Sequence, residues 1–101
     1  MLISGDEIDQ DKKKGLEMYI EQGFNGNTDA WYWLGMKYSL GEGLPQNDRL
    51  AAKFFKKAAK RGNELAMIML SSCYENGTGV FKSRRKALLW KEKAKNASGS
   101  V

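Results

Sequence analysis

The sequence predicts an all-α protein: one domain, residues 1–101, forming an α-α superhelix (solenoid) of about two and a half helix-turn-helix repeats with five helices. Three observations predict this fold. A shift of 36 positions aligns residues 28–62 with residues 64–98, and nine of the 35 aligned pairs are identical. Apolar residues recur at helical spacing in both copies. The stretch YSLGEGL at residues 38–44 also returns as YENGTGV at residues 74–80, with the same aromatic residue and the same two glycines.

The first helix of the first full repeat is predicted from three apolar residues at every fourth position. These residues share one face of a helix: Ala30, Leu34 and Tyr38. We expect Asn27 or Thr28 as the N-cap. The helix should end near Gly41, because glycine readily takes the left-handed conformation that closes a helix.

The second helix of this repeat is predicted after the turn GEGLPQN, with Asp48 as its N-cap and Gly62 as its stop. Its apolar residues follow the spacing of an amphipathic helix: Ala51, Phe54, Phe55, Ala58 and Ala59. Two rings among small alanines suit close packing between helices.

The second full repeat, residues 64–98, follows the same plan. We expect helices over residues 64–76 and 84–96, with Ser83 as the cap of the second. Upstream, residues 11–26 are predicted to form a leading half repeat with a single helix. That helix carries Leu16, Met18, Tyr19 and Ile20.

Composition argues against an enzyme, a metal site and a membrane span. The chain has no histidine, which is the commonest general base and metal ligand, and it has a single cysteine, Cys73. No catalytic residue, cofactor or metal is therefore predicted. No run of eighteen apolar residues is present. The start MLISGDEIDQ lacks the features of a secretion signal, so we expect a cytoplasmic protein as written, or a periplasmic or secreted one if a signal peptide has been removed.

The residues from Ala30 to Gly62 resemble the Sel-one-like repeats, which are relatives of the tetratricopeptide repeats. The resemblance lies in the order of an alanine, an LG pair, a tyrosine, a G-x-G-aliphatic turn, an acidic cap and then A-x-x-aromatic-aromatic-x-K-A-A. The second copy departs from this pattern at four positions: Ser71, Arg84, Lys91 and Lys95. The resemblance implies a scaffold that binds a partner protein or peptide in the concave groove lined by the first helices of the repeats.

Carried over position by position, the resemblance implies a partner-binding surface of nine residues. They are Asp29, Tyr32, Trp33, Met36, Ser39, Leu65, Ile68, Ser72 and Glu75. The large rings also suit a core, so packing is the alternative role for Tyr32 and Trp33. We assign Trp31 to the core, together with Phe81 and Trp90, and we expect Trp33 and Met36 to contact the partner.

Two further functions remain as alternatives. Residues 1–30 hold seven acids and three bases, whereas residues 31–101 hold five acids and fourteen bases, so a basic convex face would attract nucleic acid. We favour a solvated face, because no aromatic platform accompanies the lysines. The resemblance also allows an immunity-type inhibitor of a bacterial toxin. Leu88 and Leu89 have no following repeat to cover them, so we expect the chain to fold back over them or a homodimer to form through this repeat end.

Overall fold

The computed structural model describes residues 14, 15, 17, 18, 20–23 and 25–97. Helical residues between 14 and 23 are followed by four helices in chain order: α2 (Thr28–Leu40), α3 (Asp48–Lys60), α4 (Glu64–Asn76) and α5 (Arg84–Ala97). No strand occurs in this part of the chain. The all-α superhelix with five helices is therefore confirmed.

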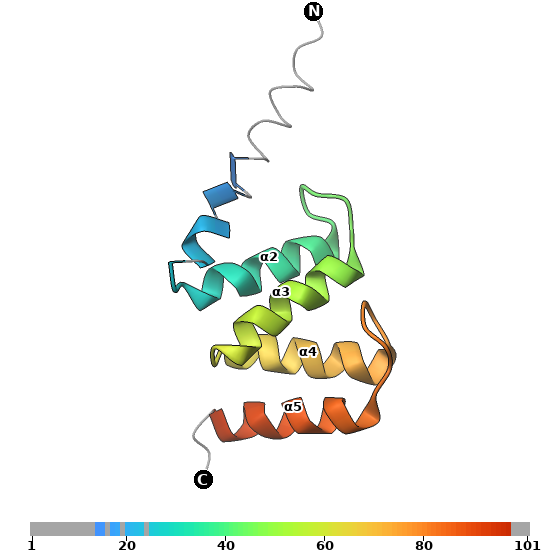
Figure 1. Cartoon of the computed structure of the whole chain (residues 1–101). Coiled ribbons are helices and arrows are strands. Elements are labelled where there is room, and N and C mark those ends of the chain that lie inside the picture. Colours follow the sequence, from blue (N-terminus) through green and yellow to red (C-terminus); the bar gives the residue numbers. More distant parts are fainter. Residues whose placement is uncertain (1–13, 16, 19, 24, 98–101) are drawn as a thin grey trace, which may run out of the picture.

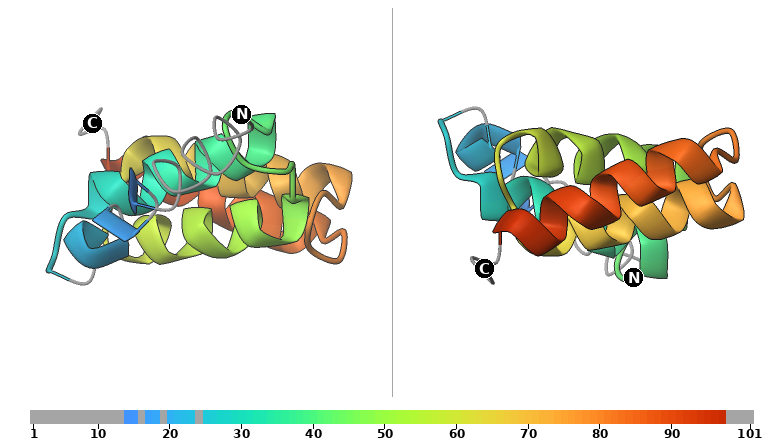
Figure 2. Two further views of the ribbon diagram at one scale, coloured as in Figure 1. Left: turned by 90° about the horizontal axis from the view of Figure 1, so that it is seen from above. Right: turned by 90° about the horizontal axis from the view of Figure 1, so that it is seen from below.

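The helices stack in the order of the sequence, with α2 toward the N-terminal end and α5 at the opposite end (Figure 1). Each helix packs against the next, so that α3 lies between α2 and α4, whereas α4 is the main partner of α5 among the described helices. Figure 2 views the stack along its length and shows α2 and α4 toward one side, with α3 toward the other. Helices α3 and α4 therefore each have a described helix on both sides.

Asparagine side chains cap three of these helices. Asn27 accepts hydrogen bonds from two backbone N–H groups of the first turn of α2, at 3.1 and 3.3 Å. Asn47 accepts from the N–H of Leu50 at 3.0 Å, and Asn63 caps α4 in the same way. The prediction that Asp48 caps α3 is wrong, because Asn47 has the extended backbone of an N-cap and Asp48 is the first helical residue. At that position the carboxylate of Asp48 still interacts favourably with the positive end of the helix dipole and stabilises α3.

The first helix of each repeat ends in the same way. Gly41 and Gly77 take left-handed backbone angles, with φ of 71° and 70°. Their N–H groups donate to the carbonyl groups of Lys37 and Cys73, four residues back. Each turn therefore starts from a glycine because side chains are disfavoured in this conformation.

The core runs continuously through the four helices. Its largest fully buried side chains are Trp31, Phe55, Leu34 and Leu70. Around them α3 contributes four buried alanines, Ala51, Ala52, Ala58 and Ala59. Small residues on both sides of α3 let it approach α2 and α4 closely, which is how a thirteen-residue helix takes part in two interfaces.

Trp31 lies at the centre of the N-terminal part of the core, as predicted, with 1% of its surface exposed. Its ring stacks on that of Phe54 at 5.6 Å, and the ammonium group of Lys57 lies 5.3 Å from its centre. A Cβ atom at Gly23 would overlap the Trp31 indole, so only glycine fits there. The Gly23 carbonyl accepts a hydrogen bond from Arg61 Nη1 at 2.9 Å, which joins the leading helical residues to the end of α3.

The leading half repeat is described only in part. Ile20 packs against the core, whereas Met18 is 58% exposed. Leu16 and Tyr19, the other two apolar residues predicted there, lie outside the described residues.

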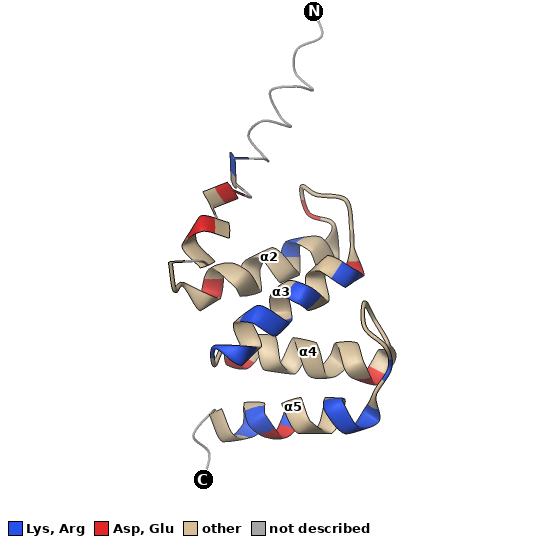
Figure 3. Cartoon of the chain, viewed as in Figure 1, with Lys and Arg blue, Asp and Glu red and all other residues tan. Residues whose placement is uncertain are grey.

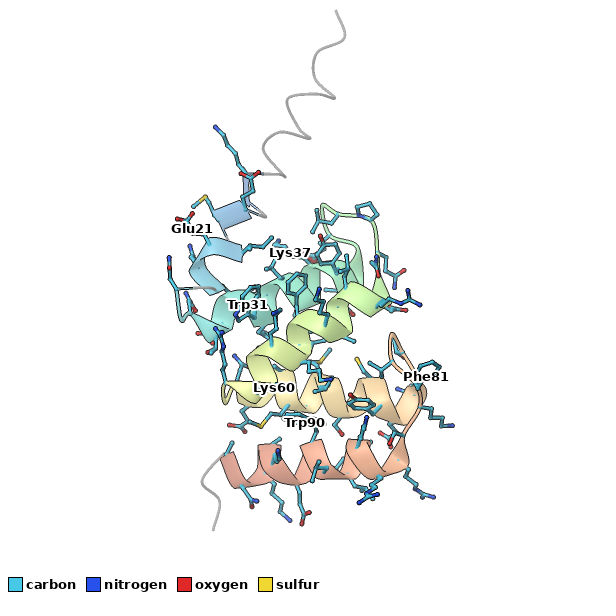
Figure 4. All side chains as sticks on the ribbon, in the orientation of Figure 1. Glu21, Trp31, Lys37, Lys60, Phe81 and Trp90 are labelled. Atoms are coloured by element: carbon cyan, nitrogen blue, oxygen red, sulfur yellow. The ribbon has the colours of Figure 1, made fainter. Side chains whose placement is uncertain are left out.

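Two aromatic residues of the second repeat have different outcomes. Trp90 is buried, as predicted, and Lys93 Nζ lies 4.7 Å from its ring. The assignment of Phe81 to the core is wrong, because Phe81 is 96% exposed and projects from the turn after α4 (Figure 4). Val80 takes the inward position of this turn and packs against the core, so the next residue points into solvent.

The charges are distributed unevenly over the stack. Figure 3 shows that the basic residues gather on α3 and α5, whereas the helical residues before α2 carry acids. Helices α2, α3 and α4 each have an acidic residue in the first turn, and α5 has none. None of the described helices combines the length and the apolar character needed to cross a bilayer.

Candidate functional site

The predicted binding residues of α2 are only partly accessible. Trp33 is 52% exposed and Asp29 is exposed, whereas Tyr32, Met36 and Ser39 are half-buried. The Tyr32 ring lies 6.0 Å from that of Phe55 and 5.6 Å from that of Trp33. Tyr32 therefore takes part in packing as well as in the surface.

Asp29 has a structural partner across the repeat boundary. Its carboxylate accepts a hydrogen bond from Asn63 Nδ2 at 3.0 Å. Asn63 in turn caps α4 by accepting from the N–H of Ala66 at 2.8 Å. The carboxylate of Asp29 thus helps to fix where α4 begins.

The corresponding residues of α4 are more exposed. Leu65 and Ile68 are 56% and 49% exposed, and Ser72 and Glu75 are exposed as well. The 36-residue shift places Ile68 on Tyr32 and Glu75 on Ser39, both of which are half-buried. The same helical positions are therefore more open in the second repeat than in the first.

Two adjoining hollows lie between the exposed side of α4 and α5. One, of about 180 Å³, is lined by Ile68, Ser71, Ser72, Glu75 and Lys91. The other, of about 360 Å³, is lined by Glu75, Lys82, Arg84, Ala87, Leu88 and Lys91. Because they share Glu75 and Lys91, we describe them together as the end groove. Lys82, Arg84, Leu88 and Lys91 are absent from the predicted surface, which was drawn from the first helices of the repeats alone.

A comparison of the second helices of the two repeats shows why this groove is open. The positions of Ala51 and Ala58 in α3 are also buried alanines in α5. In contrast, Ala52 and Ala59 are buried, whereas the corresponding Leu88 and Lys95 are exposed. Since α3 has a helix on both sides and α5 on one, the side that carries Leu88 is the side that a following repeat would cover.

Two paired substitutions change the shape of this side of the stack. In the first repeat, a Cβ atom at Gly35 would lie 2.6 Å from the ring of Phe55, so glycine is needed under the ring. In the second repeat, the same two positions hold Ser71 and Lys91. With no ring above it, Ser71 is buried and its hydroxyl donates to the Ala87 carbonyl at 2.8 Å. The two substitutions, Ser71 for Gly35 and Lys91 for Phe55, are therefore compatible with each other. Together they replace a buried aromatic ring by an exposed cation.

Several basic residues of α3 and α5 contribute to the folded structure. Lys57 and Lys93 lie over the rings of Trp31 and Trp90, and Lys86 Nζ lies 5.5 Å from the ring of Tyr74. Each contact of this kind contributes about 0.5 to 1 kcal/mol at an exposed site. Some of the lysines on α3 and α5 therefore have a structural role, because they pack over aromatic rings.

The described residues contain no group of three or more potential metal ligands from histidine, cysteine, aspartate and glutamate. The single thiol, Cys73, is buried in α4. Burial raises the pKa of the Cys73 thiol above its ordinary value of 9.0, and the negative charge of Asp48 adds to this effect. The thiol is therefore neutral at pH 7 and poorly reactive.

We expect Cys73 to react with a thiol reagent only after the protein unfolds. The raised pKa also predicts a pH effect on stability: below pH 9.0 the neutral thiol is present in both the folded and unfolded states. Above that value the unfolded chain loses its proton first, so the free energy of unfolding decreases as the pH rises. Urea titrations of the native protein and of Cys73→Ala between about pH 8 and 10.5 test this, because the substitution should make the decrease shallower. Equal slopes, or rapid labelling of the folded protein, would contradict the assignment.

Comparison with known proteins identifies relatives of the whole stack. The Sel1 repeat model matches residues 1–21, 28–63 and 64–98. A crystal structure of a Sel1 repeat protein from Oxalobacter formigenes is similar to this chain, with 37% identity over 82% of it and a TM-score of 0.76. Helicobacter pylori cysteine rich protein B is similar in fold, with 23% identity over 89% of this chain, 71% coverage of its own and a TM-score of 0.77.

A third similar structure is c5321, a protective antigen present in uropathogenic Escherichia coli strains that displays an SLR fold. It shares 27% identity over 93% of this chain, with a TM-score of 0.68. The chain spans 24% of the length of the Oxalobacter structure and 26% of the length of the E. coli structure. All three similar structures come from bacteria, which indicates a bacterial origin for this chain.

Proposed function

This chain belongs to the Sel1 repeat family, whose members are generally non-catalytic protein-interaction scaffolds, and we propose that it binds a partner protein or peptide on the exposed side of α2 and α4. The observation that carries the proposal is the set of large apolar side chains left open on these two helices. Trp33 and Leu40 of α2 and Leu65 and Ile68 of α4 are each about half exposed or more.

These residues form pairs on their helices. Trp33 and Leu40 are seven residues apart and share one face of α2, and Leu65 and Ile68 are three apart on α4. Single exposed apolar residues are ordinary, but groups of them mark interaction sites. Covering a half-exposed side chain of this size contributes about 1 kcal/mol, so the four together contribute about 4 kcal/mol, and further contacts around them must offset the entropy cost of association.

The partner is a protein rather than a small molecule because the described surface offers open hollows and side chains suited to a broad contact. Trp33 has the shape of a binding anchor, since it brings a large contact area with few torsions to order. Inhibition of a toxin would be one use of the same surface. No feature of the described surface favours that use, or nucleic acid binding, over a general scaffold.

Site-directed photo-crosslinking tests the proposal. A benzophenone amino acid is placed at Trp33, at Leu65 or, as the control, at Lys56, which is exposed on α3. We expect crosslinks to the same partner from positions 33 and 65 in an extract of the source bacterium, and none to it from position 56. Identical products from all three positions, or products from position 56 alone, would exclude this side of the stack as the binding surface.

A further inference from the structure

We propose that the end groove binds an acidic segment of a partner protein, with an apolar side chain of the segment against Ile68 and Leu88 and its carboxylates facing Lys82, Arg84 and Lys91. This inference rests on the proposed function as a protein-binding scaffold, and it names the chemistry of the segment that is recognised. It also places recognition at the end of the stack, apart from Trp33 and Leu40.

The position of the groove provides the first support. The equivalent side of the first repeat packs against α4. The groove therefore lies where the next helix of a repeat stack would pack. On that side of the first repeat the residues are Ala52, Phe55 and Ala59, all of them buried. This side of the second repeat is open, so it is suited to receiving an elongated segment.

The residues that replace this apolar set determine what the segment must carry. Leu88, Lys91 and Lys95 stand where the first repeat has Ala52, Phe55 and Ala59. A helix like α4 presents Ala66 and Met67 to the core. Against Lys91 it would bury a charge without a partner, which costs several kcal/mol. A segment that carries carboxylates at these points removes that cost.

The charge of the groove provides the second support. Three cations line it, Lys82, Arg84 and Lys91, against one carboxylate, Glu75. No described acidic side chain forms an ion pair within 4.0 Å with any of these cations. Arg84 also occupies the position of Asp48 in the first repeat, so α5 begins with a cation where α3 begins with an acid. The positive potential that results is unfavourable to the free protein, and an acidic partner would lower it.

The apolar component of the groove favours a protein segment over nucleic acid. Ile68 and Leu88 are 49% and 56% exposed, and they supply aliphatic rather than aromatic surface. Nucleotide bases stack on aromatic rings, whereas leucine or methionine side chains of a peptide pack well on aliphatic ones. A combined requirement for carboxylates and an apolar side chain is the signature expected of the bound segment.

Fluorescence anisotropy with labelled peptides of about twelve residues tests this inference on the full chain. One peptide carries four acidic residues around a pair of leucines. In three matched peptides the acids become amides, the acids become lysines, or the leucines become serines. We expect only the acidic peptide with leucines to bind well, and to weaken as salt rises from about 50 to about 300 mM, because exposed charge pairs are screened.

Two substitutions assign the binding to the groove. Lys91→Gln and Leu88→Ser should each weaken the acidic peptide about fivefold, the effect of losing one charge pair or one half-covered leucine. Lys53→Gln is the matched control, since Lys53 is an exposed lysine of α3 outside the groove, and it should change affinity less than about twofold. Circular dichroism of each variant establishes that it is folded.

Several results would overturn the inference. They are equal binding of the acidic and amide peptides, equal loss with Lys53→Gln and Lys91→Gln, or tighter binding of a single-stranded oligonucleotide of the same charge. Sedimentation that shows a dimer sensitive to Leu88→Ser would instead assign the groove to a second copy of the chain. If the crosslinks from Trp33 and Leu65 persist in any of these cases, the proposed scaffold function stands and only the acidic segment is excluded.

Discussion

Replacing Gly79 by alanine should destabilise the protein by about 2 to 4 kcal/mol. Holding a residue with a side chain in the left-handed conformation costs about 1 to 2 kcal/mol. Steric overlap of the new Cβ with the backbone of α3 adds a comparable amount. Gly79 has φ of 75°, and an added Cβ would overlap the backbone carbonyl group of Asp48 and lie 3.0 Å from the nitrogen of Arg49. Backbone atoms at the start of a helix cannot move aside as a flexible side chain can. The turn after α4 would therefore separate from the start of α3.

Gly43→Ala is the matched control for this prediction. Gly43 occupies the same place in the first repeat and has φ of 76°, but an added Cβ there meets no described atom within 4 Å. The loss should therefore be only about 1 to 2 kcal/mol, which is the backbone cost alone. Urea denaturation followed by far-UV circular dichroism measures both. Equal losses would show that the contact between the turn and α3 contributes nothing to stability.

Trp31→Ala should cost about 3 to 5 kcal/mol, as is typical when a large buried ring is removed. Its ring is 1% exposed, stacks on Phe54 at 5.6 Å and covers Gly23. The leading helical residues pack on α2 and α3 partly through this ring, so they should lose their contacts together with it. Small domains have only about 5 to 15 kcal/mol of stability. The variant should therefore lose a large fraction of its free energy of unfolding and melt at a lower temperature than the native protein.

Trp33→Ala separates the two tryptophans, which lie two residues apart on the same helix. Because Trp33 is 52% exposed, its removal should change the free energy of unfolding by less than about 1 kcal/mol. Thermal melts of both variants, monitored by circular dichroism, test the contrast. A similar loss from both would mean that Trp33 is part of the core and is not available to a partner.

Local sequence signals were sufficient to predict most of the helices. Apolar residues at helical spacing, together with capping residues and turn glycines, place the predicted limits within a residue of α2, α3, α4 and α5. These signals act within a few residues along the chain, so they can be read without knowledge of the neighbours. The sequence did not identify the N-cap of α3, because Asn47 and Asp48 are both good capping residues. Only the backbone angles show that Asn47 is the cap.

The candidate surface was less predictable, because burial depends on what lies opposite a residue. Tyr32 and Ile68 occupy equivalent positions, yet one is half-buried and the other is 49% exposed. Likewise, Phe81 is the larger apolar side chain of its turn, yet it faces solvent, whereas Val80 packs inward. Such differences require the positions of the neighbouring helices.

By itself, therefore, the sequence determined the repeat, the helices and the family, since each is encoded by spacing along one chain. Only the tertiary structure decided which residues compensate each other. Gly23 lies beneath Trp31, whereas the equivalent pair at the boundary between the two full repeats is Ala59 and Met67, and Gly35 lies beneath Phe55. It also decided that the end groove is open. The physical reason is that side chains distant in sequence share one volume, and whether that volume is filled depends on the neighbours of each helix.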